Sequence, residues 1–262
     1  MIPKIYITQW KKNAPWNNDY QVEQDLVIER ALVEIFSDSE LKEQLAFRGG
    51  TALHKLFLKP QARYSEDIDL VQIKKGSIGD ILTLIREKLE FLGTAKYNAS
   101  IHNATLVYRF KSEAEPVVTL KLKIEINTRE HYAVFGYKHY AYDIKSEWFR
   151  KNCKLTSYSI EELLSTKLRA LYQRRKGRDL FDLYYAYQKL EPDSMKIIEG
   201  FKEYLSNDGL SVTSKEYAAN MEDKILDSDF IGDTVALLRT EIEYDVKIAW
   251  GLVKRKLIEK LN

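Results

Sequence analysis

Two carboxylates one residue apart, Asp67 and Asp69, lie in an apolar stretch that is predicted to form a β-strand. Because the side-chain period of a strand is 2, both side chains point to the same face. Two such carboxylates could bridge hard cations, which prefer oxygen ligands. The alternative is a solvent-exposed strand edge, which the apolar residues Ile68, Leu70 and Val71 disfavour. An EF-hand is excluded, because no glycine and bidentate glutamate follow at the required spacing.

A glycine pair, Gly49 and Gly50, opens a predicted helix near Thr51, and Gly50 lies 17 residues upstream of Asp67. Glycines let the backbone approach a phosphate closely, since no Cβ intervenes. The free N–H groups at the start of a helix then point at the anion. A glycine turn, a helix and an acidic strand in this order indicate a site for a nucleoside triphosphate and its Mg²⁺ ions.

Glu125 is the candidate for a third carboxylate, either as a metal ligand or as a general base. It lies in the alternating segment VTLKLKIEIN, which predicts a strand over 117–127. An unpaired acid among these β-branched residues would be costly. The alternative is a salt bridge to Lys121 or Lys123, which share its strand face by parity.

Composition limits the classes of protein to consider. The chain has 262 residues, 31% charged and 45% hydrophobic, as in ordinary globular proteins. No apolar run approaches the roughly 18 residues of a membrane span, and no signal-peptide core begins the chain. The single cysteine, Cys153, excludes an intramolecular disulfide and fits a reducing compartment. We therefore expect a cytoplasmic protein without a membrane partner.

One segment is strongly basic although the net charge is only +2. Residues 167–178 (KLRALYQRRKGR) carry six Lys or Arg and no acid. This concentration could contact nucleic-acid phosphates, with Arg174, Arg175 and Lys176 as the predicted RNA-binding residues. The alternative is a solvated helix face.

The hydrophobic patterns of the segments that carry these residues predict an α+β fold in two domains, an N-terminal domain of residues 1–154 and a helical domain of residues 155–262. Helices are expected within 20–46, broken near 37–39, after Arg48 until Pro60, and over 77–92 with Ser77 as N-cap. Strands are expected at 67–73, 105–111 and 117–127. From residue 155 the pattern is helical, with helices expected at 159–174, 179–190, 193–205, 214–226 and 240–261.

Three segments together resemble a known family. FRGGTALHKLFLKPQARYSEDIDL is similar to the nucleotidyltransferase superfamily pattern of a glycine pair, a helix and Asp-x-Asp, as in DNA polymerase β-like enzymes. More narrowly, Gly-Gly-Thr-x-Leu and Ser-x-Asp-x-Asp resemble the AbiEii/AbiGii toxin family of type IV toxin–antitoxin and abortive-infection systems. Lys167 and the later Arg178-Asp179-x-x-Asp182 also match. The resemblance covers roughly residues 45–190.

This resemblance implies a nucleotidyltransferase-like N-terminal half, residues 1–154, with a mixed sheet flanked by helices, before the helical half. It also implies that Lys167 neutralises phosphate charge and that Asp179 orients it or serves in the reaction, with Asp182 on the same helix face. Capping of a helix start is the alternative for Asp179. The implied site consists of nucleotide contacts at Gly49, Gly50, Thr51, Ser65 and Lys167, Mg²⁺ ligands at Asp67, Asp69 and Glu125, and catalytic residues Asp67, Asp69, Glu125, Lys167 and Asp179.

The function implied is transfer of a nucleoside monophosphate from an NTP to RNA, at the 3′ end of a tRNA, with release of pyrophosphate. Such a toxin would have a cognate antitoxin. Two other interpretations stay open. The acceptor could be a protein side chain or a small molecule such as an aminoglycoside, or the chain could be an NTP-binding module without turnover.

Overall fold

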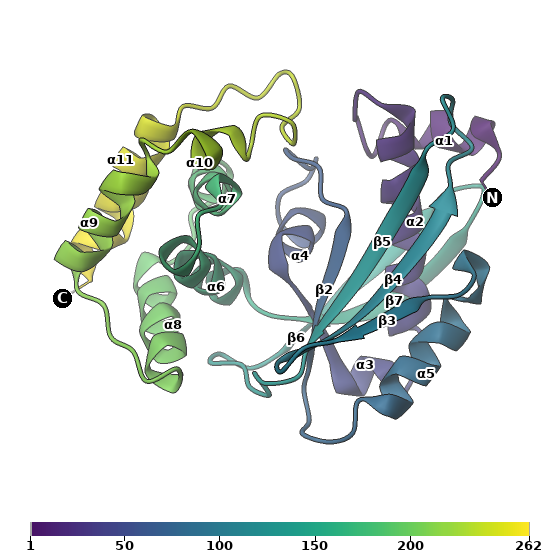
Figure 1. Cartoon of the computed structure of the whole chain (residues 1–262), viewed down its shortest axis with the longest axis horizontal. Coiled ribbons are helices and arrows are strands. Elements are labelled where there is room, and N and C mark those ends of the chain that lie inside the picture. The colour runs from purple at the N-terminus through teal and green to yellow at the C-terminus, as the bar shows by residue number, and fades with distance from the viewer. Residues whose placement is uncertain (1, 262) are drawn as a thin grey trace. The chain divides into compact units, whose positions relative to one another are not determined.

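The computed structural model describes residues 2–261, which form two compact units (Figure 1). Unit 1 comprises residues 2–132 and 137–158, and unit 2 comprises residues 133–136 and 159–261. The predicted domain boundary after residue 154 falls inside a strand, β7 (Arg150–Ser157), that belongs to unit 1.

Unit 1 is built on a mixed sheet, which confirms the α+β prediction. Within residues 2–261 the sheet has seven strands in the order β3-β4-β5-β2-β1-β7-β6. Strand β2 pairs antiparallel with β1 and parallel with β5, and β1 pairs parallel with β7. The strands are β1 (Leu45–Arg48), β2 (Asp67–Gln72), β3 (Lys96–Ala99), β4 (Asn103–Lys111), β5 (Thr119–Asn127), β6 (Lys138–Lys145) and β7.

The core of unit 1 lies under one face of this sheet. Burial alternates along β5, where Leu122, Ile124 and Ile126 are buried and the residues between them are partly or fully exposed. Helix α2 packs against β2, β5, β6 and β7. The helices of the unit are α1 (Lys4–Trp10), α2 (Asp19–Phe36), α3 (Leu41–Gln44), α4 (Gly49–Leu56), α5 (Gly79–Lys88) and the 3₁₀ turn η1 (Glu90–Leu92).

Two details of unit 1 differ from the sequence-based prediction. Helix α5 begins at Gly79 after Ile78, which makes no side-chain capping bond, so the prediction of Ser77 as N-cap was wrong. The Ser77 hydroxyl instead accepts the Gly79 N–H at 3.3 Å, outside the helix-capping position. Strands β1, β3, β6 and β7 were not predicted. Strands β1 and β3 have only 4 residues each, and the first halves of β6 and β7 contain no buried residue.

Unit 2 is helical, as predicted. Helix α6 starts after Ser159, whose hydroxyl accepts the Glu162 N–H at 3.3 Å. The buried Glu162 carboxylate accepts the N–H groups of Val134 and Phe135, which explains why 133–136 belong to this unit. The helices are α6 (Ile160–Gln173), α7 (Gly177–Lys189), α8 (Ser194–Asn207), α9 (Ser214–Lys224), α10 (Ser228–Gly232), α11 (Val246–Lys256) and the 3₁₀ turn η2 (Ile258–Lys260).

Across residues 2–261, none of these helices combines the length and the apolar character that a membrane span requires.

Candidate active site

The glycine turn and the acidic strand lie in direct contact. Gly49 has a φ of +77°, a conformation that favours glycine. A Cβ at this position would lie 2.2 Å from Oδ2 of Asp69. Gly49 is therefore required not only for a turn into α4 but also because the Asp69 carboxylate lies against its Cα.

Hydrogen bonds join α4 to the start of β2. The buried Thr51 hydroxyl donates to the Asp67 carbonyl oxygen at 2.6 Å. Thr51 Oγ1 also lies 2.6 Å from Ser65 Oγ, and since its single proton is used, Ser65 is the donor. The structure thus brings Thr51, Ser65, Asp67 and the glycine pair together. Their contacts with a nucleotide stay a prediction, and Thr51 has a structural role in addition.

Within residues 2–261, the Asp67 carboxylate lacks the hydrogen bonds that would offset the cost of its burial. Its Oδ1 is buried and has no hydrogen-bond partner among the described residues. Burial and the charge of Asp69 raise the pKa of Asp67 to about 6, although Lys123 and Lys121 oppose this shift. An unsatisfied buried oxygen carries a desolvation cost, and a cation brought by a ligand would relieve it.

Glu125 lies directly beside Asp69 in the parallel ladder of β2 and β5, where Asp67 is aligned with Lys123. Its carboxylate forms an ion pair with Lys123. Burial disfavours the charged form of Lys123, but its hydrogen bond to Glu125 and the nearby acids raise its pKa overall. The structure therefore contains the salt bridge that was the alternative for Glu125. A metal or base role for Glu125 stays a prediction.

The protein supplies only some of the oxygen ligands that a Mg²⁺ ion requires. Within residues 2–261, no three His, Cys, Asp or Glu side chains are grouped so that they could hold a metal. Protein-bound Mg²⁺ commonly takes one or two carboxylates and completes its shell with substrate phosphates and water. Asp67, with its unpartnered Oδ1, and Asp69 fit that arrangement.

Arg48 is a site neighbour that the sequence-based prediction missed. It is aligned with Asp69 in the β1–β2 ladder, and its guanidinium donates to Glu130 at 2.6 Å. Arg48 is also the N-cap residue of α4, and it makes no side-chain capping bond to that helix. The available signal was the apolar run Leu45–Phe47 before the glycine pair, which is too short to distinguish a strand from a helix by its pattern.

In unit 2, the predicted residues Lys167, Asp179 and Asp182 form one buried network. The Lys167 ammonium lies 2.9 Å from an oxygen of each aspartate, and both aspartates are fully buried. Arg174 adds two hydrogen bonds to Asp179, at 2.7 and 2.9 Å. Burial alone would raise the pKa of Asp179, but Lys167 and Arg174 lower it overall. The reaction roles of Lys167 and Asp179 stay predictions, and their pairing shows that they also hold α6 to α7.

The predicted RNA-binding residues are likewise paired within unit 2. Arg174 binds Asp179, Arg175 donates to Asp227 at 2.8 Å, and Lys176 lies 3.5 Å from Asp233. The positive charge that made this segment conspicuous in the sequence is thus compensated by Asp179 beside the segment and by Asp227 and Asp233 farther along the chain. RNA binding by these three residues stays a prediction.

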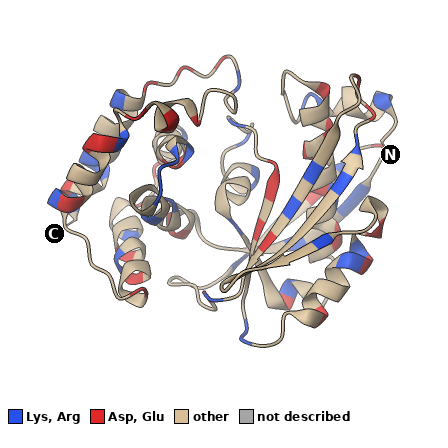
Figure 2. Cartoon of the chain, in the orientation of Figure 1, with Lys and Arg blue, Asp and Glu red and all other residues tan. Residues whose placement is uncertain are grey.

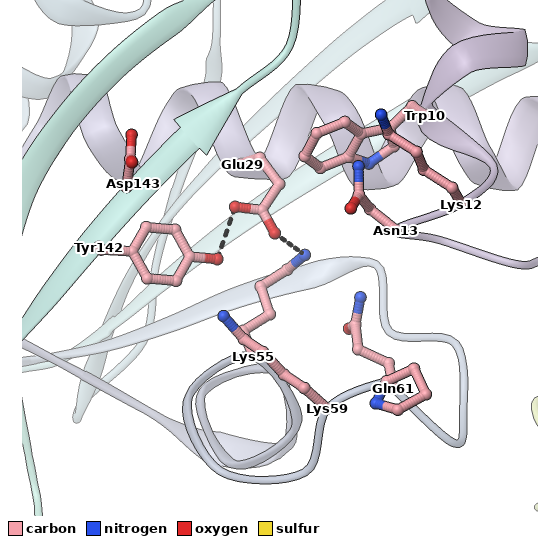
Figure 3. Close-up of a pocket in the computed structure, with 10 residues that line it drawn as sticks. Trp10, Lys12, Asn13, Glu29, Lys55, Lys59, Gln61, Tyr142 and Asp143 are labelled. Carbon is pink, nitrogen blue, oxygen red and sulfur yellow. Dashed lines mark hydrogen bonds and ion pairs between the residues drawn. The ribbon is translucent and has the colours of Figure 1, made fainter.

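A polar pocket in unit 1 had no counterpart in the sequence-based prediction. The cavity, of about 270 Å³, is lined by residues that include Lys12, Lys59 and Gln61 (Figure 3). At its floor Lys55 is buried between Asp25 and Glu29, at 2.7 and 2.8 Å. Tyr142 donates to Glu29, and Trp10 and Gln61 donate to Asp25. These residues come from four separate segments, so no local sequence pattern connects them.

A family model described as "Nucleotidyl transferase AbiEii toxin, Type IV TA system" matches residues 30–249. No curated protein matches the chain.

Among solved structures, the MenT4 nucleotidyltransferase toxin of Mycobacterium tuberculosis H37Rv is 15% identical with a TM-score of 0.68, covering 100% of this chain and 91% of its own. JHP933 from Helicobacter pylori is 19% identical with a TM-score of 0.55, covering 92% of this chain and 93% of its own. At these identities the two structures establish the likeness of the fold.

Proposed function

Because the chain belongs to the AbiEii family of nucleotidyltransferase toxins from type IV toxin–antitoxin systems, we propose that it transfers a nucleoside monophosphate from an NTP to RNA. The acceptor we propose is the 3′ end of a tRNA. One observation carries the proposal: the buried, unpartnered Oδ1 of Asp67 lies beside Asp69, whose carboxylate is packed against the glycine turn. This arrangement favours a ligand that supplies cations together with phosphates.

In the proposed reaction the 3′-hydroxyl oxygen of the RNA attacks the α-phosphorus of the NTP. The bond from that phosphorus to the bridging oxygen breaks, pyrophosphate leaves, and the hydroxyl proton passes to a base. Asp67 and Asp69 would hold Mg²⁺, which would neutralise charge on the phosphates. The protein's task is mostly positioning and charge neutralisation, since little covalent chemistry is required of it.

The chain's own groups have distinct tasks in this proposal. The backbone N–H groups at Gly49 and Gly50 would bind the triphosphate at the start of α4. Ser65 would contact it from the loop before β2, and Thr51 would keep Ser65 and Asp67 in register through its two hydrogen bonds. Glu125 would accept the hydroxyl proton after release from Lys123, or would keep Lys123 in place if another group is the base.

The roles proposed for Lys167 and Asp179 rest on the resemblance to the family's Lys and Arg-Asp-x-x-Asp motifs. Lys167 would contribute positive charge for a phosphate, and Asp179 would orient it. Because Asp179 and Asp182 already neutralise this lysine, its contribution requires that one of these pairs loosens when substrate binds.

The test is incubation of the purified protein with α-labelled NTPs, Mg²⁺ and total RNA, followed by separation of RNA from protein. We expect label in RNA with the wild type and none with Asp67→Ala. Equal transfer by Asp67→Ala, or no transfer by the wild type, would contradict the proposal. Label in protein or in an added aminoglycoside would identify the alternative acceptors instead.

A toxin of this class would be neutralised by a cognate antitoxin, which we propose as a partner. Co-expression with the product of the neighbouring gene should restore the growth of cells that produce the wild type. Cells that produce Asp67→Ala should grow without it. We also propose that the reaction takes place in the cytoplasm, because a single cysteine, the partly buried Cys153, fits a reducing compartment.

A further inference from the structure

One face of strands β3, β4 and β5 carries a row of basic side chains next to Asp67. Lys123 is aligned with Asp67 in the β2–β5 ladder, and Arg109 is aligned with Lys121 in the β4–β5 ladder. Residues aligned across a ladder point to the same side of a sheet. We call the following set the basic face: Lys96, Arg109, Lys111, Lys121 and Lys123.

The basic face is accessible to solvent, whereas the other face of the same strands is the core. Lys96, Arg109, Lys111 and Lys121 are exposed. Their alternating neighbours Leu106, Tyr108 and Leu122 are buried. Figure 2 shows blue bands along β4 and β5 close to red positions on β2.

The charges of the basic face are compensated much less than those of segment 174–176. Lys123 pairs with Glu125, and Lys111 donates to the Thr119 hydroxyl at 2.9 Å. Within the part of the chain that the structure describes, Arg109 and Lys121 form no ion pair. Arg175 and Lys176, by contrast, each lie against an aspartate.

We propose that the basic face binds the single-stranded phosphodiester backbone of the RNA acceptor and leads its 3′ end to Asp67 and Asp69. This inference rests on the proposed function, since it assigns a surface to the RNA substrate. Residues two apart in a strand are roughly 6–7 Å apart, so the basic face extends about 13 Å from the row of Lys123 to the row of Lys111. Glu113 and Glu115 in the following hairpin end it.

The chemistry of this face fits a phosphate backbone rather than individual bases. Lysine and arginine bind phosphates without reading sequence, and the face has no aromatic side chain on which a base could stack. Binding should therefore depend strongly on salt and weakly on RNA sequence. The first nucleotides before the 3′ end are the part that the face can reach from Asp67.

The test compares two triple variants that lose the same charge. One carries Arg109→Gln, Lys111→Gln and Lys121→Gln, and the matched control carries Lys196→Gln, Lys215→Gln and Lys247→Gln, which are exposed lysines of unit 2. Both also carry Asp69→Asn, which prevents turnover. Fluorescence anisotropy measures the Kd for a labelled single-stranded RNA at several salt concentrations.

We expect the basic-face variant to bind about tenfold or more weakly at low salt than Asp69→Asn alone. Its slope of log K against log salt should be less steep by about 2, because each lost phosphate contact on a single strand removes about 0.7. The control should match Asp69→Asn alone. Equal binding by the two triple variants, or no RNA binding by Asp69→Asn alone, would overturn the inference.

Failure of this inference can be told apart from failure of the proposed function. If the expected binding difference is found but the wild type transfers no label to RNA, the RNA surface stands and the proposed reaction fails. If the wild type labels RNA but the basic-face variant equals its control, only the surface is wrong. If a double variant Arg175→Gln, Lys176→Gln loses RNA binding and the basic-face variant does not, segment 174–176 contacts the RNA instead.

Discussion

Each unit contains a pair of aspartates on one face of one element, but the two pairs have opposite surroundings. On β2, Asp67 has a buried oxygen without a partner and a pKa raised by burial and by Asp69 to about 6. On α7, Asp179 and Asp182 are fully buried and share Lys167, and Arg174 completes the charge balance. Both pairs look alike in the sequence, and only the partners supplied by the fold distinguish them.

The difference indicates what each pair is suited to do. A carboxylate whose neighbours leave it unsatisfied can gain from an incoming cation, and such perturbed groups concentrate at functional sites. A carboxylate pair saturated by two cations has little left to offer a ligand, and its removal leaves charges buried without partners. We therefore expect substitutions on β2 to affect ligand binding and substitutions on α7 to affect stability.

The largest effect on stability should come from Lys167→Met. It removes the ammonium group that contacts both buried aspartates, Asp179 and Asp182, and breaking a buried pair in this way costs about 3–5 kcal/mol. Urea denaturation followed by circular dichroism measures the change. Loss of nucleotidyl transfer without loss of stability would contradict a mainly structural role and would support the predicted reaction role of Lys167.

Gly49→Ala should cause the next largest loss of stability, about 2–3 kcal/mol. The alanine would adopt a positive φ and would also meet Asp69 Oδ2. Gly209→Ala is the matched control, because Gly209 has a φ of +72° and open space around its Cβ position. A thermal denaturation series should show a clearly greater loss for Gly49→Ala. If both variants lose the same amount, the contact between Gly49 and Asp69 is not a constraint.

Asp67 and Asp179 should contribute to stability with opposite dependence on pH in metal-free protein. Asp67 binds its proton more tightly folded than unfolded, so its contribution to the free energy of unfolding falls as pH rises from about 4 to about 6. Asp67→Asn should remove this slope and be more stable than the wild type at pH 8 by about 2–3 kcal/mol, since one pKa unit corresponds to about 1.4 kcal/mol. The contribution of Asp179, whose pKa is lowered, is present above its ordinary pKa and is lost as pH falls through the folded value.

This contrast is measured by urea denaturation in chelator at several pH values. Asp179→Asn should be destabilised at pH 8 and should approach the wild type in acid. An Asp67→Asn variant that is less stable than the wild type at pH 8 would show that Asp67 is satisfied in the metal-free protein.

The smallest effect on stability should come from Glu125→Gln. Its ion pair with Lys123 is about 30% exposed on both sides, and such pairs contribute about 0–1 kcal/mol. The transfer assay then decides its role: a fall in rate of tenfold or more at unchanged stability is expected for a base or ligand. An unchanged rate would show that Glu125 only positions Lys123.

The sequence predicted the elements with strong local signals. The glycine turn into α4, the strand of Asp67 and Asp69, and α6 beginning after Ser159 all depend on residues close together in the chain. The α+β class followed from the same patterns. Strand β3 is exposed throughout and β7 begins with three exposed polar residues, so periodicity did not reveal them. Along β6, Tyr140, Tyr142 and Ile144 do alternate with Ala141 and Asp143, a signal that the prediction missed.

The site was harder to predict where residues that contact each other lie far apart in the sequence. The pairing of Glu125 was open because parity permits either Lys121 or Lys123 as its partner. The basic segment was conspicuous as an uninterrupted run, yet Asp227 and Asp233, some fifty residues later, compensate its charge. The basic face was invisible because its cations are spread over three strands and become neighbours only through the ladder register.

The most direct test of the central claim is calorimetric titration of Mg²⁺ and a non-hydrolysable NTP analogue into wild-type protein and the Asp67→Asn, Asp69→Asn double variant. If the β2 pair holds the cation that accompanies the nucleotide, the wild type binds the analogue in the presence of Mg²⁺ and the double variant, folded by circular dichroism, loses that Mg²⁺-dependent binding. The same Kd and the same Mg²⁺ dependence in both proteins would contradict it.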